Sequence, residues 1–205
     1  MPVVDYKTYC RMLEEAYKNN YAYPAINVAS IEAANAALKG FASAKSDGII
    51  QISKGGGSHI SGMDIKDCAL GAVSLANHIH IMAEKYNVNI ALHTDHCKAH
   101  ELDEFVYPLI AETERRRERG EKNLFNSHMF DGSDIPLEKN IEISKKLFKI
   151  CAKNEIILEV EAGVVGGEED GVNNENVPSE KLYTTPQDML DIYEALKDVC
   201  DSKYM

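Results

Sequence analysis

Short apolar segments alternate with longer amphipathic ones along the chain, and this alternation limits its fold more than any other feature. Runs with the composition of strands lie at 23–30, 48–57, 88–96, 124–133 and 155–167. Segments with helical spacing lie at 31–45, 71–87, 101–122, 136–154 and 185–200. Pro108 predicts a kink or a break in the third of these helices. Strands alternating with helices of this length predict βαβ units and a parallel sheet.

Two architectures satisfy this alternation, an open doubly wound sheet and a (β/α)₈ barrel. Polar clusters at the carboxyl ends of the strands favour the barrel, because barrel enzymes have their active sites there. The clusters read SKGGGSH, HTDH, SHMFDGS and EVEAGVVGGEED. About five strands fit into the 205 residues, whereas a barrel has eight. We therefore expect an α/β fold, either an open sheet or an incomplete barrel of about five βα units.

The composition narrows the class of partner. The formal net charge of −11 argues against a general nucleic-acid binder and against a binder of anionic membranes. No secretory signal and no apolar run of membrane-spanning length is apparent. The five cysteines are odd in number and widely spaced, as in reduced cytoplasmic proteins. For Cys97, next to His96, we expect a small apolar role rather than that of a nucleophile.

The HTDH cluster offers a metal ligand beside an acid. Side chains alternate along a strand, so His93 and Asp95 point to one face and His96 to the other unless the chain bends after Asp95. With such a bend, His96 is a candidate metal ligand and Asp95 a candidate proton donor. The alternative is structural: histidines bonded to backbone carbonyls, and Asp95 capping the next helix.

The EVEAGVVGGEED segment concentrates carboxylates. Glu159 and Glu161 share a strand face, and the acidic run 168–170 follows the glycine pair 166–167. Carboxylates placed close together need a cation or a proton to neutralise them. The segment is thus a second metal site with a mobile base, or a solvated acidic loop. Its spacing does not fit an EF-hand calcium loop.

The two remaining clusters are less specific. The glycines 55–57 expose backbone N–H groups that suit a phosphate, with the Ser53 hydroxyl beside them, but a plain turn explains them as well. Lys54 is a further candidate, as a Schiff-base lysine. In FNSHMFDGS we expect Asp131 to be a metal carboxylate. A Ser-His-Asp triad has no geometric basis there, because its three members would share one short segment.

Six segments together resemble one family in their order and spacing, over essentially the whole chain. They are YPAINV, QISKGGG, LHTDHC, SHMFD, LEVEAG and GGEEDGVNNEN. The family is the class II (zinc-dependent) fructose-bisphosphate aldolases. The resemblance implies that residues 1–205 are the N-terminal part of a single barrel domain whose C-terminal strands are absent. It implies reversible aldol cleavage of fructose 1,6-bisphosphate to dihydroxyacetone phosphate and glyceraldehyde 3-phosphate, with zinc as the Lewis acid.

The resemblance also implies roles for individual residues. Asp95 matches the acid that protonates the aldehyde oxygen, and Glu169 matches the loop carboxylate that removes the C3 proton of dihydroxyacetone phosphate. His96 matches one of three zinc histidines. Asp131 and Glu161 match the carboxylates of a second divalent metal position. The other matches are Glu168 as a further ligand there, Ser53 as a substrate-phosphate contact, and Asn27 and Gln51 at the mouth of the site.

The same resemblance implies a sugar-phosphate substrate and, for the full-length enzyme, a cytoplasmic homodimer. The other two zinc histidines should follow Met205, so we expect little or no aldolase activity from these residues alone, and an open apolar edge. The alternatives are a non-catalytic fragment or pseudoenzyme half that needs a partner chain, a tagatose-bisphosphate aldolase, and a Schiff-base aldolase using Lys54.

Overall fold

Five parallel strands form the central sheet of the protein. The computed structural model describes residues 3–163, 168–169, 172–173 and 182–200. The strands pair in chain order, β1-β2-β3-β4-β5, and every pairing is parallel. They are β1 (Ala25–Asn27), β2 (Gly48–Ser53), β3 (Ile90–Asp95), β4 (Ser127–Asp131) and β5 (Ile157–Glu161). A doubly wound sheet reverses its strand order at a switch point. The unreversed order therefore decides for the incomplete barrel.

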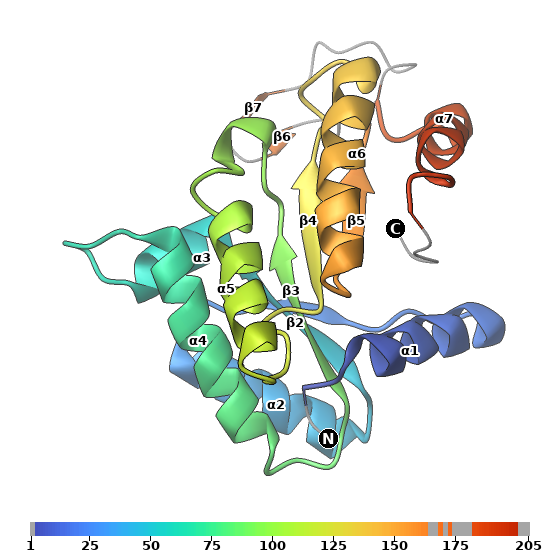
Figure 1. The fold of residues 1–205 in the computed structure, drawn as a ribbon. Coiled ribbons are helices and arrows are strands. Elements are labelled where there is room, and N and C mark those ends of the chain that lie inside the picture. The colour runs from blue at the N-terminus through green and yellow to red at the C-terminus, as the bar shows by residue number, and fades with distance from the viewer. Residues whose placement is uncertain (1–2, 164–167, 170–171, 174–181, 201–205) are drawn as a thin grey trace.

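Four helices cover the outer face of this sheet. Ile50 and Ile52 of β2 and Leu92 of β3 point to this face and are fully buried against helical side chains such as Leu38 and Leu75. In Figure 1 the last three of these helices stand side by side in front of the strands. The helices are α2 (Ile31–Ala44), α4 (Cys68–Ala83), α5 (Val106–Glu118) and α6 (Leu137–Lys153).

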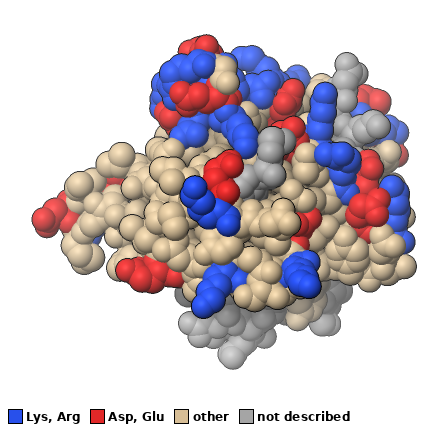
Figure 2. All heavy atoms as spheres, turned by 90° about the horizontal axis from the view of Figure 1, so that it is seen from below, with Lys and Arg blue, Asp and Glu red and all other residues tan. Residues whose placement is uncertain are grey.

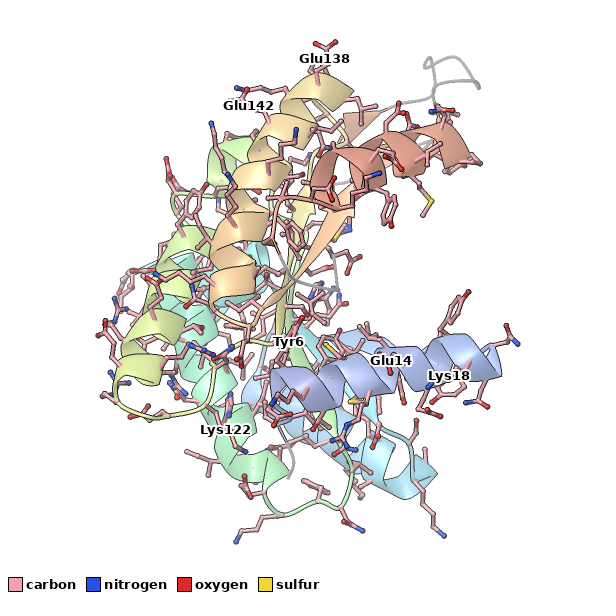
Figure 3. The ribbon with its side chains drawn as sticks, turned by 45° about the vertical axis from the view of Figure 1, so that its right-hand side comes forward. Tyr6, Glu14, Lys18, Lys122, Glu138 and Glu142 are labelled. Carbon is pink, nitrogen blue, oxygen red and sulfur yellow. The ribbon has the colours of Figure 1, made fainter. Side chains whose placement is uncertain are left out.

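A helix that the sequence reading missed, α1 (Tyr6–Asn19), packs against the inner face. Asp5 caps it by accepting a hydrogen bond from the Thr8 backbone N–H, at 2.8 Å. The buried Tyr9 and Met12 of α1 form a second apolar cluster that includes Ala91 and Ile157 of the strands. Figure 3 shows α1, with Tyr6, Glu14 and Lys18, well apart from α6, with Glu138 and Glu142. Tyr9, Met12 and Ala16 recur at helical spacing, and this pattern in the sequence could have predicted the helix.

Two boundaries differ from the expected ones. The segment 48–57 is not a strand ending in a glycine loop, because β2 ends at Ser53 and α3 (Lys54–Ile60) begins at once. The segment 101–122 is not one helix: a 3₁₀ turn, η1 (Ala99–Glu101), precedes α5, and Pro108 lies in the first turn of α5. Pro at that point leaves no helical hydrogen bond unmade, since first-turn N–H groups have no partner within the helix.

Glycines allow α3 and α4 to pack against each other at close range. A Cβ atom on Gly57 would overlap the carbonyl oxygen of Cys68, and one on Gly71 would overlap the carbonyl oxygen of Gly57. The two backbones therefore approach too closely for any side chain at these positions.

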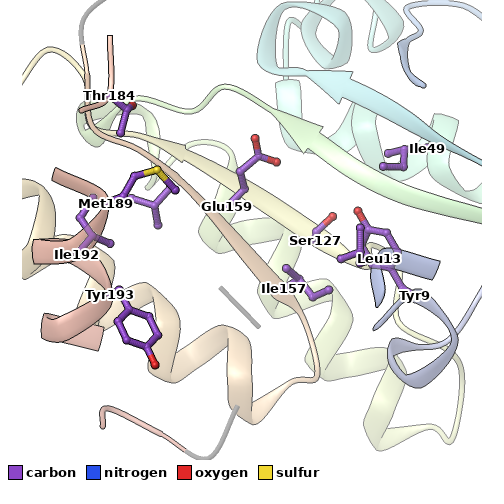
Figure 4. A pocket seen from close by; sticks show the side chains of 11 residues that line it. Tyr9, Leu13, Ile49, Ser127, Ile157, Glu159, Thr184, Met189, Ile192 and Tyr193 are labelled. Atoms are coloured by element: carbon purple, nitrogen blue, oxygen red, sulfur yellow. The ribbon is translucent and has the colours of Figure 1, made fainter. Parts of the chain in front are cut away.

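The last helix, α7 (Pro186–Leu196), begins with Thr185 and Asp188 in a capping box. Its side chains Met189, Ile192 and Tyr193 face Tyr9 and Leu13 of α1 across the inner face of the sheet (Figure 4). The pocket between them has a volume of about 590 Å³. Two short strands, β6 (Glu168–Glu169) and β7 (Val172–Asn173), pair antiparallel outside the main sheet.

The described surface is mixed in charge. Figure 2 shows the face at which the strands begin, where Lys and Arg side chains alternate with Asp and Glu side chains. No basic patch stands out on that face, in line with the negative net charge. Among the described helices, none is both long enough and apolar enough to cross a membrane.

Candidate active site

A bulge at the end of β3 aims two neighbouring side chains at the same region. The last regular pair of β3 and β4 is Thr94↔His128, and the next bridge is Lys98↔Asp131. Three residues on the β3 side, 95–97, therefore face two on the β4 side. The bulge lets both Asp95 and His96 line the mouth of the sheet, although neighbouring residues of a regular strand point to opposite faces.

Three potential metal ligands converge at this mouth. One ligand atom each from His96, Asp131 and Glu161 lies within 4.8 Å of the others. The His96 Nδ1 is 3.4 Å from a carboxylate oxygen of Asp131 and 3.4 Å from one of Glu161. The register pair Asp131↔Glu161 places the two carboxylates side by side at the ends of β4 and β5. The sequence reading had selected all three residues.

The charges in this cluster are strongly coupled. The hydrogen bond to Asp131 raises the pKa of His96 to about 9. Burial acts to raise the pKa of Asp131, but hydrogen bonds from His96 and Ser133 outweigh it and hold that pKa at about 2. The two carboxylates of Asp131 and Glu161 beside the His96 imidazole make a site that favours a cation. One imidazole nitrogen and two carboxylate oxygens suit a divalent transition metal such as zinc.

Neighbouring groups that the sequence reading missed hold the two carboxylate strands in place. Ser133 donates to Asp131 Oδ1 through both its backbone N–H, at 2.9 Å, and its hydroxyl, at 2.5 Å. The Asn140 amide donates to the Glu161 backbone carbonyl at 2.7 Å. The Asp-Gly-Ser sequence after a strand was the available signal for the Ser133 turn, since aspartate readily accepts from the residue two positions on.

Asp95 lies next to this cluster and has one oxygen fixed. The Asn27 amide at the end of β1 donates to Asp95 Oδ2 at 2.6 Å. Gln51 is the register partner of both Asn27 and His93, one strand over from each. The structure thus brings the candidate acid and the two expected mouth residues onto three neighbouring strands.

A second pocket, of about 600 Å³, opens beside Asp95 and His96 and has Ser53 and Lys98 in its wall. Ser53 caps α3 by accepting from the Gly56 N–H at 3.1 Å. This leaves the Ser53 hydroxyl hydrogen available for another acceptor. The glycines themselves do not form an open phosphate loop. They lie within α3, and Gly56 and Gly57 are buried.

Lys54 does not have the environment of a Schiff-base lysine. Its Nζ lies 3.0 Å from a Glu101 carboxylate oxygen and 3.1 Å from one of Glu104. Partial burial acts to lower the pKa of Lys54, but these two hydrogen bonds outweigh it and raise that pKa. A Schiff-base lysine needs a neutral amine, so this environment disfavours that role.

Cys97 and His93 are accounted for by packing and hydrogen bonding. Cys97 is fully buried, and burial raises the pKa of its thiol to about 12, which fits the apolar role expected for it. His93 is also buried, and its Nδ1 lies 2.7 Å from the Ser127 hydroxyl. Its Nε2 is 3.4 Å from a Glu159 carboxylate oxygen. Ser127 and His93 form a hydrogen-bonded pair with Glu159 beside it, rather than a nucleophilic triad, because Ser127 is only 2% exposed.

The two candidate residues of the acidic loop are only partly described. Glu168 and Glu169 form strand β6, but their side chains lie outside the described part of the structure. The expected roles of Glu168 as a metal ligand and Glu169 as a base therefore stay predictions. The same holds for Asp170, which lies outside the described residues.

The fold and this site together define a singly wound α/β protein with a candidate metal centre at the carboxyl ends of its strands. The family model for class II fructose-bisphosphate aldolase matches residues 7–202. The chain belongs to the class II fructose-bisphosphate aldolase family.

Relatives agree with this assignment. The chain is 51% identical over all 205 residues to the fructose-bisphosphate aldolase of Mycobacterium tuberculosis and 52% identical to that of Mycobacterium leprae, and it spans 59% of each. The crystal structure of the fructose-bisphosphate aldolase of Campylobacter jejuni superposes with a TM-score of 0.85 at 32% identity. That match covers 98% of this chain and 57% of the other. The chain thus spans somewhat more than half the length of the proteins it matches.

Proposed function

We propose that this chain forms the N-terminal part of a zinc-dependent fructose-bisphosphate aldolase. The reaction is reversible cleavage of fructose 1,6-bisphosphate into dihydroxyacetone phosphate and glyceraldehyde 3-phosphate. One observation supports it above the others: His96, Asp131 and Glu161 converge beside Asp95. The names of the relatives point to the same substrate.

The donor set fits a divalent metal. His96, Asp131 and Glu161 offer one imidazole and two carboxylates that are close enough to share a divalent ion. Bound zinc would act as a Lewis acid on the ketose carbonyl and so stabilise the enediolate. Two further histidines from outside the 205 residues, and a second divalent metal on Asp131, Glu161 and Glu168, stay predictions.

The roles of the protein groups follow from their positions. Asn27 donates a hydrogen bond to one oxygen of Asp95. The other oxygen of Asp95 exchanges a proton with the aldehyde oxygen of the substrate. Glu169 takes the C3 proton of dihydroxyacetone phosphate. Ser53, with its hydroxyl hydrogen unused by the helix cap, donates to a substrate phosphate. Gln51 lines the same mouth.

A second candidate is a half-barrel that is active only with a partner chain. The pocket of about 590 Å³ on the inner face favours it, because apolar side chains from α1 and α7 line a space that β-strands fill in a complete barrel. A cytoplasmic homodimer and the choice of fructose over tagatose 1,6-bisphosphate rest on the family resemblance and stay predictions.

The experiment compares two proteins. One is the 205-residue chain alone. The other, the barrel-length chimera, joins residues 1–205 to the part of the Mycobacterium tuberculosis aldolase that follows its matched region. The chimera should cleave fructose 1,6-bisphosphate, lose activity with a chelator and regain it with zinc. The chain alone should be inactive. If the half-barrel alternative holds, adding the C-terminal part as a separate polypeptide should make it active.

Variants of the chimera test the assigned residues. Asp95→Asn should lower kcat by roughly 100-fold or more, because it removes the acid. His96→Ala should also remove bound zinc. His78→Ala on α4, whose ring contacts Asn35 in the helical layer, is the matched control and should keep both activity and zinc. A folded chimera that cleaves neither fructose nor tagatose 1,6-bisphosphate would contradict the proposal, and so would activity that survives the chelator but is trapped by borohydride.

A further inference from the structure

The backbone pairing between β3 and β4 is unusually short for strands that position a site. β2 and β3 share six register pairs, and β4 and β5 share five. β3 and β4 share only two, His93↔Ser127 and Thr94↔His128, before the bulge with Asp95 and His96 begins. The backbone pairing resumes only at the Lys98↔Asp131 bridge, where the Asp131 N–H donates to the Cys97 carbonyl at 2.9 Å, so Asp95 and His96 lie in an unpaired stretch between the two.

Each of these two pairs has a side-chain hydrogen bond, one on either face of the sheet. On the inner face, His93 Nδ1 lies 2.7 Å from Ser127 Oγ. On the outer face, Thr94 Oγ1 lies 2.8 Å from His128 Nδ1. All four residues are at most 3% exposed. We call these two bonds the β3–β4 clamp.

The inner bond is one of several contacts among neighbouring polar side chains on the inner face. Burial lowers the pKa of His93 to about 4, so the ring is neutral and has one N–H group. That N–H belongs on Nε2, where the Glu159 carboxylate can only accept. Nδ1 then accepts from the Ser127 hydroxyl, and Tyr9 of α1 has a side-chain hydrogen bond with the same Ser127. In Figure 4 the Tyr9 and Ser127 hydroxyl groups point toward one another.

The outer bond is shielded from solvent. Thr94 and His128 are fully buried, and the His128 ring lies 5.5 Å from the ring of Phe125. Burial lowers the pKa of His128 to about 3, so this ring is neutral as well. A hydrogen bond without competing water has a single favoured geometry, and breaking it leaves a buried polar group unsatisfied.

We propose that the β3–β4 clamp is a positioning device for the reaction. It fixes the last paired residues of β3 and so sets where the bulge presents Asp95 to the substrate and His96 to the metal. Thr94, Ser127, His93 and His128 act through their neighbours and touch no reacting atom. The inference rests on the proposed aldolase function, and it adds residues to which neither the family resemblance nor the relatives assign a role.

The test uses the barrel-length chimera. Thr94→Val removes the outer bond with nearly the same shape, and Ser127→Ala removes the inner one. Thr94→Ser, which restores the hydroxyl, is the rescue variant. Thr113→Val is the matched control, because Thr113 is also fully buried and its hydroxyl has no hydrogen-bond partner in the described structure. The readouts are kcat, KM, the zinc dissociation constant by chelator competition, and Tm.

Thr94→Val and Ser127→Ala should each lower kcat by roughly tenfold or more, weaken zinc binding by about tenfold, and leave KM within about twofold. Thr94→Ser should recover most of the kcat, and Thr113→Val should keep parental kcat and zinc affinity. A purely structural role would lower Tm while kcat per bound zinc stays parental, and that result would overturn the inference. An inactive parent chimera would instead refute the proposed function, and the zinc constants would still test the clamp.

Discussion

At the scale of single residues, the site depends on which atoms already have partners. Asp95 has one oxygen held by Asn27, and Asp131 has one oxygen held by Ser133. Each carboxylate is thus anchored through one oxygen, which fixes its rotamer, and the second oxygen of Asp131 faces His96. Such preorganisation is worth more than the presence of the carboxylate alone, because misplacement by an ångström can cost a large part of the rate.

Removing the partner of Asp95 should therefore reduce the rate. Asn27→Ala in the barrel-length chimera should lower kcat by about tenfold, since Asp95 is then free to leave its productive rotamer. Steady-state kinetics with fructose 1,6-bisphosphate measures this. Asn35→Ala on α2 is the control, and parental kcat in Asn27→Ala would show that the 2.6 Å hydrogen bond has no part in catalysis.

The buried His128 should make stability depend on pH. Its pKa of about 3 in the folded protein lies below the ordinary value of 6.5, so between these values the unfolded chain takes up a proton that the folded protein does not. The free energy of unfolding should fall as the pH drops from about 7 toward 4. His128→Phe should reduce the slope of that fall in urea unfolding of the chimera, and an unchanged slope would contradict the assignment.

At the scale of elements, the contact between α3 and α4 sets the position of the Ser53 cap. The α3 helix follows β2 without a loop, and its glycines let α4 pack against its backbone. A sequence reading that treats three glycines as a loop misses this, because the helix exists through tertiary contact rather than through propensity.

Glycine substitutions should separate this contact from ordinary helix propensity. Gly71→Ala should lower the free energy of unfolding by about 3 kcal/mol or more, since its Cβ would overlap backbone rather than a movable side chain. Gly40→Ala in α2 has nothing within 4 Å and should raise it by about 0.5–1 kcal/mol. Urea unfolding measures both. Equal effects of the two substitutions would show that the close approach is unimportant.

At the scale of the whole molecule, the inner face is the least complete part of the described structure. Tyr9 and Leu13 of α1 and Met189 and Tyr193 of α7 line a pocket that remains open between them. Met189 is 64% exposed and Tyr193 is 54% exposed. Apolar surface of this kind normally belongs to an interface or to an interior.

The 205-residue chain alone should therefore bind an apolar dye more strongly than the chimera does. We expect strong fluorescence of anilinonaphthalene sulfonate with the chain alone and weak fluorescence with the chimera, at equal concentration. A circular dichroism spectrum and a cooperative urea transition confirm that the chain alone is folded during the measurement. Equal dye binding by the two folded proteins would mean that the C-terminal part does not cover this face.

The sequence by itself determined the alternation of five strands with helices, the parallel sheet and the gathering of polar side chains, Asp131 and Glu161 among them, at the carboxyl ends of the strands. These follow from local periodicity and from the rule that parallel strands present their carboxyl ends at one edge. The choice between open sheet and incomplete barrel, the bulge that turns His96 beside Asp95, the helical glycines of α3 and the β3–β4 clamp needed the tertiary structure. They depend on strand register and on contacts between residues more than thirty positions apart, such as Thr94 with His128, which no local pattern encodes.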